Sequence, residues 1–196
     1  MIPSTTLSAS TSSARERLLG AAAVLFYSDG IAGTGIDAIV KRAGVAKKSL
    51  YNNFDSKAAL VAAYLEARHA EWLTLYEMRL TEAFTSEDRV LAVFLAYQDH
   101  AEWAYERGFR GCGLLNAAAE LPAGHDGRSV VLRHKQQVES LLAAPLKELT
   151  DEATAARLAQ QLAFLLEGAM VRAGLEGNSR CVRQAHDMAT TMVNAL

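Results

Sequence analysis

One short stretch of the chain carries the polar groups that proteins use to bind nucleic acid: Lys47, Lys48, Ser49, Tyr51 and Asn52. A lysine donates to phosphate oxygens or to guanine O6 and N7, an asparagine pairs with adenine, and hydroxyl groups bind phosphate. Placed on one helix, these side chains would fit the major groove of B-DNA. The N-terminus of that helix would add free N–H groups that attract phosphate. The stretch therefore predicts contact with duplex DNA.

The flanking residues predict a helix-turn-helix over about 35–54 that would position these side chains. Gly44 can adopt the positive φ of a sharp turn between a helix over 36–43 and one over 47–53. Val45 is expected to fill the gap between the two helices. The apolar residues that give these helices their buried faces are Ile36, Ile39, Val40, Leu50 and Phe54.

Helical periodicity continues through most of the chain, and no stretch shows the sustained alternation of a half-buried strand. We therefore expect an all-α fold of about nine helices. Pro145 should kink or shorten the seventh helix, and the proline and glycines of 121–128 predict a loop. The expected helices cover residues 12–28, 36–43, 47–53, 56–80, 86–107, 111–120, 127–149, 152–175 and 179–195.

Charge is distributed unevenly along the 196 residues, although the net charge is only −2. Residues 1–58 hold seven basic and four acidic side chains, a net charge of +3, which leaves −5 for the rest. A basic N-terminal head on an acidic body directs the head toward a polyanion. Apolar residues make up 51% and charged residues 21%, which is ordinary for a globular protein.

Composition and motifs argue against several other classes of protein. Two cysteines are too few for a disulfide framework and fit a reducing cytoplasm. Residues 1–13, rich in Ser and Thr, are expected to form a disordered arm rather than a signal peptide. No apolar run is long enough to span a bilayer. His and Cys do not cluster at metal-ligand spacing and no nucleophile elbow or phosphate loop occurs, so we expect no metal, no cofactor and no enzyme.

The head resembles the tetracycline-repressor (TetR) type of bacterial transcription regulators over about residues 14–62. Two positions depart from the usual pattern: Lys48 stands where the family very often has Gly, and Gly35 replaces the usual Thr or Ser. The extra cation at Lys48 should strengthen DNA contact or alter its preference. The residues that carry the resemblance are Gly30, Thr34, Ile39, Ala43, Gly44, Val45, Leu50, Tyr51, Phe54, Ser56, Lys57 and Leu60.

The resemblance implies a homodimer with C2 symmetry that binds a palindromic operator. It also implies a small-molecule pocket in the C-terminal domain, whose occupancy lowers operator affinity. Thr34 and Lys57 join the expected DNA contacts. The expected domains are a DNA-binding head at 14–58 and a body at 59–196 for effector binding and dimerisation.

Candidate residues follow for the two tasks of the body. A small apolar or aromatic effector would contact Trp72, Tyr76, Phe94, His100, Trp103, Cys112, Asn116, Glu120, Phe164, Glu167 and Met170. A four-helix dimer interface built from the last two helices of each subunit would use Leu158, Leu162, Leu166, Ala185, Ala189 and Met192. Aromatic residues on helices also form plain core, and Cys112 is either a redox-sensing thiol or a small packed residue.

Two other functions remain open at this point. A family member that organises DNA or binds a protein would need no effector, and a body without a cavity of about 300 Å³ or more would favour it. An all-α enzyme or metalloprotein would need His100, Glu120 and His134 to converge in one pocket.

Overall fold

The computed structural model describes residues 12–196, which form nine α-helices and no strand. The all-α prediction is therefore confirmed. Of the expected N-terminal arm, residues 1–11 lie outside the described part of the chain. The helices are α1 (Ala14–Asp29), α2 (Ile36–Ala43), α3 (Lys47–Asn53), α4 (Lys57–Leu80), α5 (Ser86–Glu102), α6 (Gly113–Glu120), α7 (Asp126–Leu146), α8 (Glu152–Glu176) and α9 (Arg180–Val193).

Helices α1 to α3 form a small head with its own apolar centre. The helix α1 begins at a capping box, in which the Ser13 hydroxyl accepts from the Glu16 N–H and the Glu16 carboxylate accepts from the Ser13 N–H. Gly44 adopts φ 61°, which is the left-handed conformation expected for the turn between α2 and α3. Ile39 and Leu50 are fully buried between the three helices. The predicted helix-turn-helix is therefore confirmed, with both helices at the expected residues.

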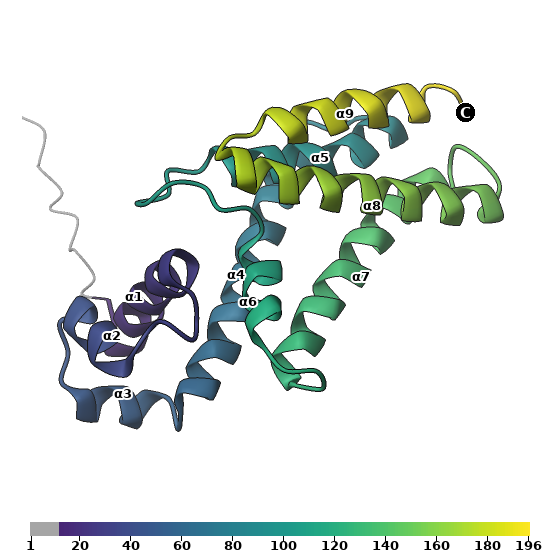
Figure 1. Ribbon diagram of the computed structural model, residues 1–196. Coiled ribbons are helices and arrows are strands. Elements are labelled where there is room, and N and C mark those ends of the chain that lie inside the picture. The colour runs from purple at the N-terminus through teal and green to yellow at the C-terminus, as the bar shows by residue number, and fades with distance from the viewer. Residues whose placement is uncertain (1–11) are drawn as a thin grey trace, which may run out of the picture.

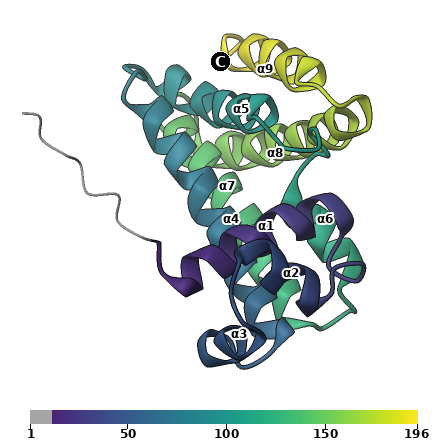
Figure 2. The same cartoon turned by 90° about the vertical axis from the view of Figure 1, so that its left-hand side faces the viewer.

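Helices α4 to α9 form the body, and α4 is the continuous element that leads from the head into it (Figure 1). In the body α5 packs on α4, α7 and α9, whereas α8 packs on α7 and α9. The last two helices lie side by side at the end of the molecule farthest from α3 in both views (Figures 1 and 2). Helix α3 and the last two helices therefore lie at opposite ends of the molecule.

Two expected helix ends are corrected by the structure. The fifth helix was expected to reach residue 107 but ends at Glu102, because Trp103 is extended and the following segment turns back toward the head. The seventh was expected to reach 149 but ends at Leu146, with Pro145 inside its last turn. Proline has no N–H group to donate to the carbonyl four residues earlier, and its ring clashes with that carbonyl, so it disfavours further helix, and α7 ends one residue after Pro145.

Candidate nucleic-acid interface and its connection to the body

The outer face of α3 presents most of the side chains that the sequence singled out for DNA. Lys47, Lys48, Tyr51 and Asn52 are exposed, and Ser49 is half-buried. Their backbone is held from beneath, because α3 packs on α1 and α2 through its buried face. A rigid, exposed and basic helix face is what the major groove accommodates. Contact of each of these residues with DNA stays a prediction.

The two lysines differ in their surroundings. Lys47 forms an exposed ion pair with Asp37 of α2, with 2.8 Å between Nζ and Oδ1. This hydrogen bond and the charge of Asp37 raise the pKa of Lys47, so its ammonium group stays charged at neutral pH. Within residues 12–196, Lys48 forms no ion pair, and its charge faces solvent. Exposed pairs contribute little to stability, so phosphate can compete with Asp37 for Lys47.

The expected DNA contact of Thr34 is wrong in this structure. Thr34 is 3% exposed, and its hydroxyl donates to the carbonyls of Gly30 and Leu25 at 2.6 and 3.3 Å. It therefore fixes the connection between α1 and α2. Lys57 is half-buried and its Nζ donates to the Ile31 carbonyl at 2.6 Å, so its ammonium group has an internal partner, and its contact with DNA stays a prediction.

Arg17 of α1 holds the helix-turn-helix together, a role that the sequence did not reveal. Its guanidinium donates to the Ala43 carbonyl from Nε and Nη2, at 3.0 and 2.6 Å, and to the Gly44 carbonyl from Nη2 at 2.5 Å. Carbonyl groups at a helix C-terminus lack intrahelical partners and carry partial negative charge, so a cation stabilises them. The long separation in sequence gives no pattern from which this contact could be predicted.

Glu120, at the end of α6, binds the head rather than a ligand pocket. Its two carboxylate oxygens accept from the N–H groups of Ile31 and Ala32, at 3.0 and 2.8 Å. Gly30 precedes this contact with φ 82°, and a Cβ there would lie 2.8 Å from a Glu120 oxygen. The assignment of Glu120 to the effector pocket is therefore corrected, because both of its oxygens are engaged with the head.

The loop before α6 makes a second connection to the C-terminus of α1. The Arg110 guanidinium donates to the carbonyls of Tyr27 and Ser28, at 2.7 and 2.5 Å. The Tyr27 hydroxyl donates to the Gly111 carbonyl at 3.1 Å and accepts from the Arg110 N–H at 2.6 Å. Asp29 and Arg107 form an ion pair beside these contacts. The segment 103–120 therefore clamps the end of α1 to the body.

The clamp can be tested with Glu120→Ala, which leaves two backbone N–H groups without their acceptor. We expect faster amide hydrogen exchange at residues 30–33 and a loss of about 1.5–3 kcal/mol in the free energy of opening this connection, which is the usual contribution of a hydrogen bond to a charged group. Glu77→Ala, an exposed position on α4, is the control. Unchanged exchange at 30–33 in Glu120→Ala would show that the connection does not depend on the carboxylate.

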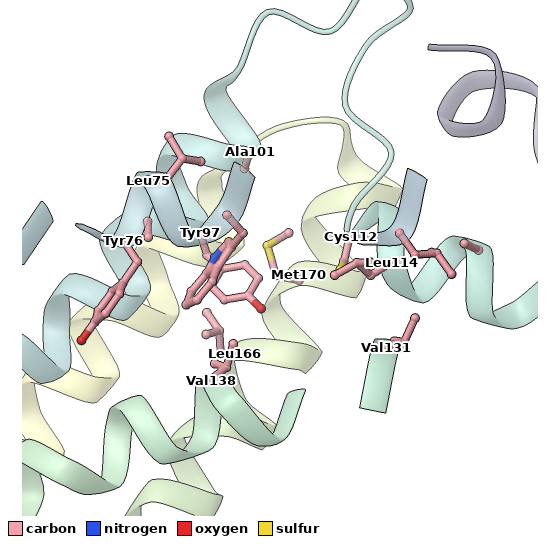
Figure 3. Close-up of a cluster of buried hydrophobic side chains, with 14 of the residues drawn as sticks. Leu75, Tyr76, Tyr97, Ala101, Cys112, Leu114, Val131, Val138, Leu166 and Met170 are labelled. Atoms are coloured by element: carbon pink, nitrogen blue, oxygen red, sulfur yellow. The ribbon is translucent and has the colours of Figure 1, made fainter. Parts of the chain in front are cut away.

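Several expected pocket residues meet in a buried aromatic and polar cluster in the body. The centroid of the Trp72 ring lies 5.0 Å from that of the Tyr97 ring and 5.3 Å from that of the His134 ring. Figure 3 shows Tyr97 among buried side chains from several helices, with Met170 and Cys112 nearby. The Tyr97 hydroxyl lies 3.2 Å from His134 Nε2, and His69 Nδ1 lies 2.9 Å from His134 Nδ1.

Burial sets the protonation state of this cluster. It lowers the pKa of His134 to about 3, with the positive charge of Lys135 as a further cause, so the imidazole is neutral at neutral pH. Burial likewise lowers the pKa of His100 to about 4 and raises that of Tyr97 to about 12. At neutral pH the imidazoles of His134 and His100 and the phenol of Tyr97 are therefore neutral, with the charged Lys135 ammonium 5.6 Å from the Tyr97 ring centroid.

The eleven expected pocket residues do not line one cavity. Trp72, Tyr76, Phe94, His100, Cys112 and Met170 are buried. Trp103 is 52% exposed on the loop after α5, and Phe164 is 65% exposed on the outer face of α8. Asn116 donates to the Arg110 carbonyl, and Glu167 lies 3.6 Å from Lys135 in an ion pair. The expectation of one common pocket is corrected, because the helices direct these side chains to different parts of the body.

The residues expected at the dimer interface also point elsewhere. Five of the six expected interface residues are at most 7% exposed and pack within the subunit, between α8, α9 and the helices beneath them. The sixth, Met192, is half-buried. Side chains with so little exposed surface offer a second copy almost no area to contact. The exposed apolar side chains of these helices are instead Phe164, Val171, Leu175 and Met188. The corrected residues are Leu158, Leu162, Leu166 and Ala189; Ala185 lines the groove shared by Phe164 and Met188, so its place at the interface stays a prediction.

Two features are absent from residues 12–196. No three His, Cys, Asp or Glu side chains come together at a distance that could hold a metal ion. No helix in that part of the chain combines the length and the apolarity needed to cross a membrane.

Comparisons with known proteins agree with this geometry. The family described as bacterial regulatory proteins, tetR family, matches residues 18–64, which span the head and the start of α4. The HTH-type transcriptional repressor NemR of Escherichia coli K12 is 32% identical over 139 residues, covering 68% of this chain and 67% of NemR. The chain belongs to the TetR family. It is therefore a DNA-binding transcriptional regulator by descent.

Solved structures extend the similarity of this TetR-family chain to the body. A TetR-family transcriptional regulator from Streptomyces coelicolor superposes with a TM-score of 0.80 and 28% identity, covering 93% of each chain. The reduced form of E. coli NemR superposes with a TM-score of 0.75 and 26% identity, covering 91% of this chain and 95% of that one. The arrangement of head and body is thus shared with proteins of the family.

Proposed function

We propose that this chain is a homodimeric transcriptional repressor that binds a palindromic operator through α3 of each subunit and leaves it when a small molecule binds. The observation that carries the proposal is the exposed face of α3, with Lys47, Lys48, Tyr51 and Asn52 supported by a buried underside. The 32% identity to the repressor NemR supports repression over activation. The proposed division is a head at 14–58 and a body at 59–196.

Dimerisation is proposed through the outer faces of α8 and α9. The exposed side chains of Phe164, Val171 and Leu175 follow one side of α8. Met188 of α9 lines a groove together with Phe164. All four are more than half exposed in the single chain. Large apolar side chains gathered on one surface mark a protein interface. In a C2 dimer the same patch of both subunits would be buried, so each of these residues would contribute once from each subunit.

Release by an effector is proposed to act through the clamp between head and body. The segment 103–120 contacts α1 through Arg110 and Glu120, so a ligand that displaces this segment would reorient the head. Hollows of about 300 to 470 Å³ open on the body and at its boundary with the head, which is the size of ligand sites. A coupling of about 1–3 kcal/mol between effector and operator would be normal for such a switch.

The same proposal places the protein in the cytoplasm, where the chromosome of a bacterium is accessible, and gives it no catalytic centre. The groups considered for an enzyme do not converge: Glu120 binds the head, whereas His100 and His134 are held in the buried core. A reacting site needs its acid, base and nucleophile within reach of one substrate.

The proposal is tested by selecting binding sites from a random pool of duplex DNA with the full chain. Two heads in a symmetric dimer should enrich inverted repeats whose half-sites are separated by about one helical turn, roughly 34–36 Å, or a multiple of it. Binding should weaken steeply as salt rises, because lysines on phosphate release counterions. Enrichment of a single half-site, or of no sequence, would contradict a dimeric repressor.

A further inference from the structure

A cleft of about 460 Å³ lies between α1, α4 and the loop that follows α5, at the junction of head and body. It is separate from the buried cluster around Tyr97 and from the groove on α8 and α9. Its size falls in the range of small-molecule sites, roughly 300–1,000 Å³. Its walls come from both sides of the junction, so an occupant would touch the head and the body together.

Aromatic rings form the wall on the side of the body. Tyr105 stacks on Tyr27 with ring centroids 4.5 Å apart, and Trp103 stands beside them with half of its surface exposed. The α1 side of the cleft combines small residues, including Gly20 and Ala23, with the buried ring of Tyr27. A Cβ added at Gly20 would meet no atom within 4 Å. This open space beside exposed ring surface suits a flat aromatic molecule.

An ion pair of α4 lines the same cleft. Arg68 pairs with Glu71 one turn later, and these side chains are only 20% and 23% exposed. The Nε–H of Arg68 is buried and has no hydrogen-bond partner within residues 12–196. Burial raises the pKa of Glu71, against the opposing effect of Arg68. A buried guanidinium N–H without an acceptor is costly. A ligand oxygen could reach it only by displacing the Glu71 side chain that pairs with Arg68.

We propose that this cleft binds a planar aromatic carboxylate, with the ring against Trp103 and the carboxylate on Arg68 in place of Glu71. A guanidinium matches a carboxylate in a two-bond fork, and a fork that includes Nε would also satisfy the unpartnered N–H of Arg68. The loop at 103–106 also contacts the head through an ion pair, with 2.5 Å between Glu106 Oε2 and Arg42 Nη2. A ligand in the cleft would therefore act on the position of the head. The effect of this movement on operator binding rests on the proposed function.

The test uses isothermal titration calorimetry of the full chain without DNA, with 2-naphthoate as the probe and 2-naphthalenemethanol as its uncharged counterpart. Arg68→Met should weaken naphthoate binding about tenfold or more, because a charge-assisted pair is lost. Glu71→Gln should strengthen it, because the isosteric amide no longer competes for the guanidinium. Binding of 2-naphthalenemethanol should change less than twofold in both variants. Equal naphthoate affinity in the wild-type chain and both variants would overturn the proposal.

A second pair of variants tests the position of the site without changing any charge. Ala23→Leu fills the α1 side of the cleft and should abolish naphthoate binding, whereas Ala62→Leu on the exposed side of α4 should not. Undiminished binding in Ala23→Leu would overturn the location. These results are independent of the operator: a chain that binds naphthoate but selects no DNA site would contradict the proposed function alone, and the reverse result would contradict this inference alone.

Discussion

Replacing Lys47 and Lys48 together by alanine is expected to lower operator affinity about a thousandfold at 0.15 M salt. A dimer would lose four phosphate contacts. Each contact releases counterions from the DNA, so its contribution to the logarithm of the affinity grows as the logarithm of the salt concentration falls. The slope of log affinity against log salt should fall by about three to four units for the same reason. Fluorescence anisotropy with a labelled operator over a salt series measures both quantities.

The matched control removes two positive charges from the body instead. Arg133→Ala with Lys147→Ala changes the net charge equally, but these exposed side chains lie on α7 and just after its last residue, in the body rather than on α3. Its salt slope should stay at the wild-type value. If the Lys47 and Lys48 variant bound the operator as the wild type does, the assignment of α3 as the recognition helix would be wrong. A loss that differs between operator sequences would show that one lysine reads a base.

Phe164→Asp should convert the dimer into a monomer. Each copy of the interface loses the burial of one phenylalanine, about 1.5–3 kcal/mol, and the symmetry doubles this to about 3–6 kcal/mol. The dissociation constant of the dimer should therefore rise about 10² to 10⁴-fold, and more if the two carboxylates stay buried. Sedimentation equilibrium at micromolar concentration measures the change, and operator affinity should fall with it.

Phe84→Asp is the control because Phe84 is an exposed phenylalanine on the loop between α4 and α5. It should remain dimeric. Phe164 is 65% exposed in the single chain, so its replacement should leave the thermal unfolding of the subunit nearly unchanged. A dimer that persists in Phe164→Asp would place the interface on another face of the molecule.

The choice of Phe164 illustrates what helix periodicity cannot determine. Leu162 and Leu166 share an apolar face with Leu158, so the pattern correctly indicates that this face is buried. It does not indicate whether another helix of the same subunit or a second subunit covers the face. Here α7 and α9 cover it. Phe164, two positions after Leu162, lies about 200° around the helix axis from it and is exposed on the opposite side of α8. A charge at Leu166 would therefore disturb folding before dimerisation.

The head was predictable because its signals are local. Gly44, the apolar positions of α2 and α3 and the polar face at 47–52 all lie within residues 36–54, and 3.6-residue periodicity converts their spacing directly into faces. The bounds of α2 and α3 follow from the sequence alone for this reason. Local signals also fixed the all-α class, since no alternating stretch competes with the helical pattern.

The connections between head and body depend on contacts that no local pattern encodes. Glu120 reaches Ile31 across 89 positions, and Arg110 reaches Tyr27 across 83. The sequence identifies such residues as polar groups beside apolar stripes, which fits a ligand contact, a surface charge or a clamp equally well. Only the packing of α6 against α1 decides among them, because a side chain takes the partner that the fold brings within hydrogen-bond distance.

The sequence by itself thus determined the helical class, the helix-turn-helix and the basic face of α3, because each rests on the spacing of residues along one or two neighbouring helices. The tertiary structure alone decided that Thr34 is buried, that Glu120 clamps the head, that Phe164 faces outward, and that Arg68 and Trp103 border one cleft. These outcomes depend on which helices meet and at what rotation about their axes, and that is settled by the burial of the whole apolar surface together.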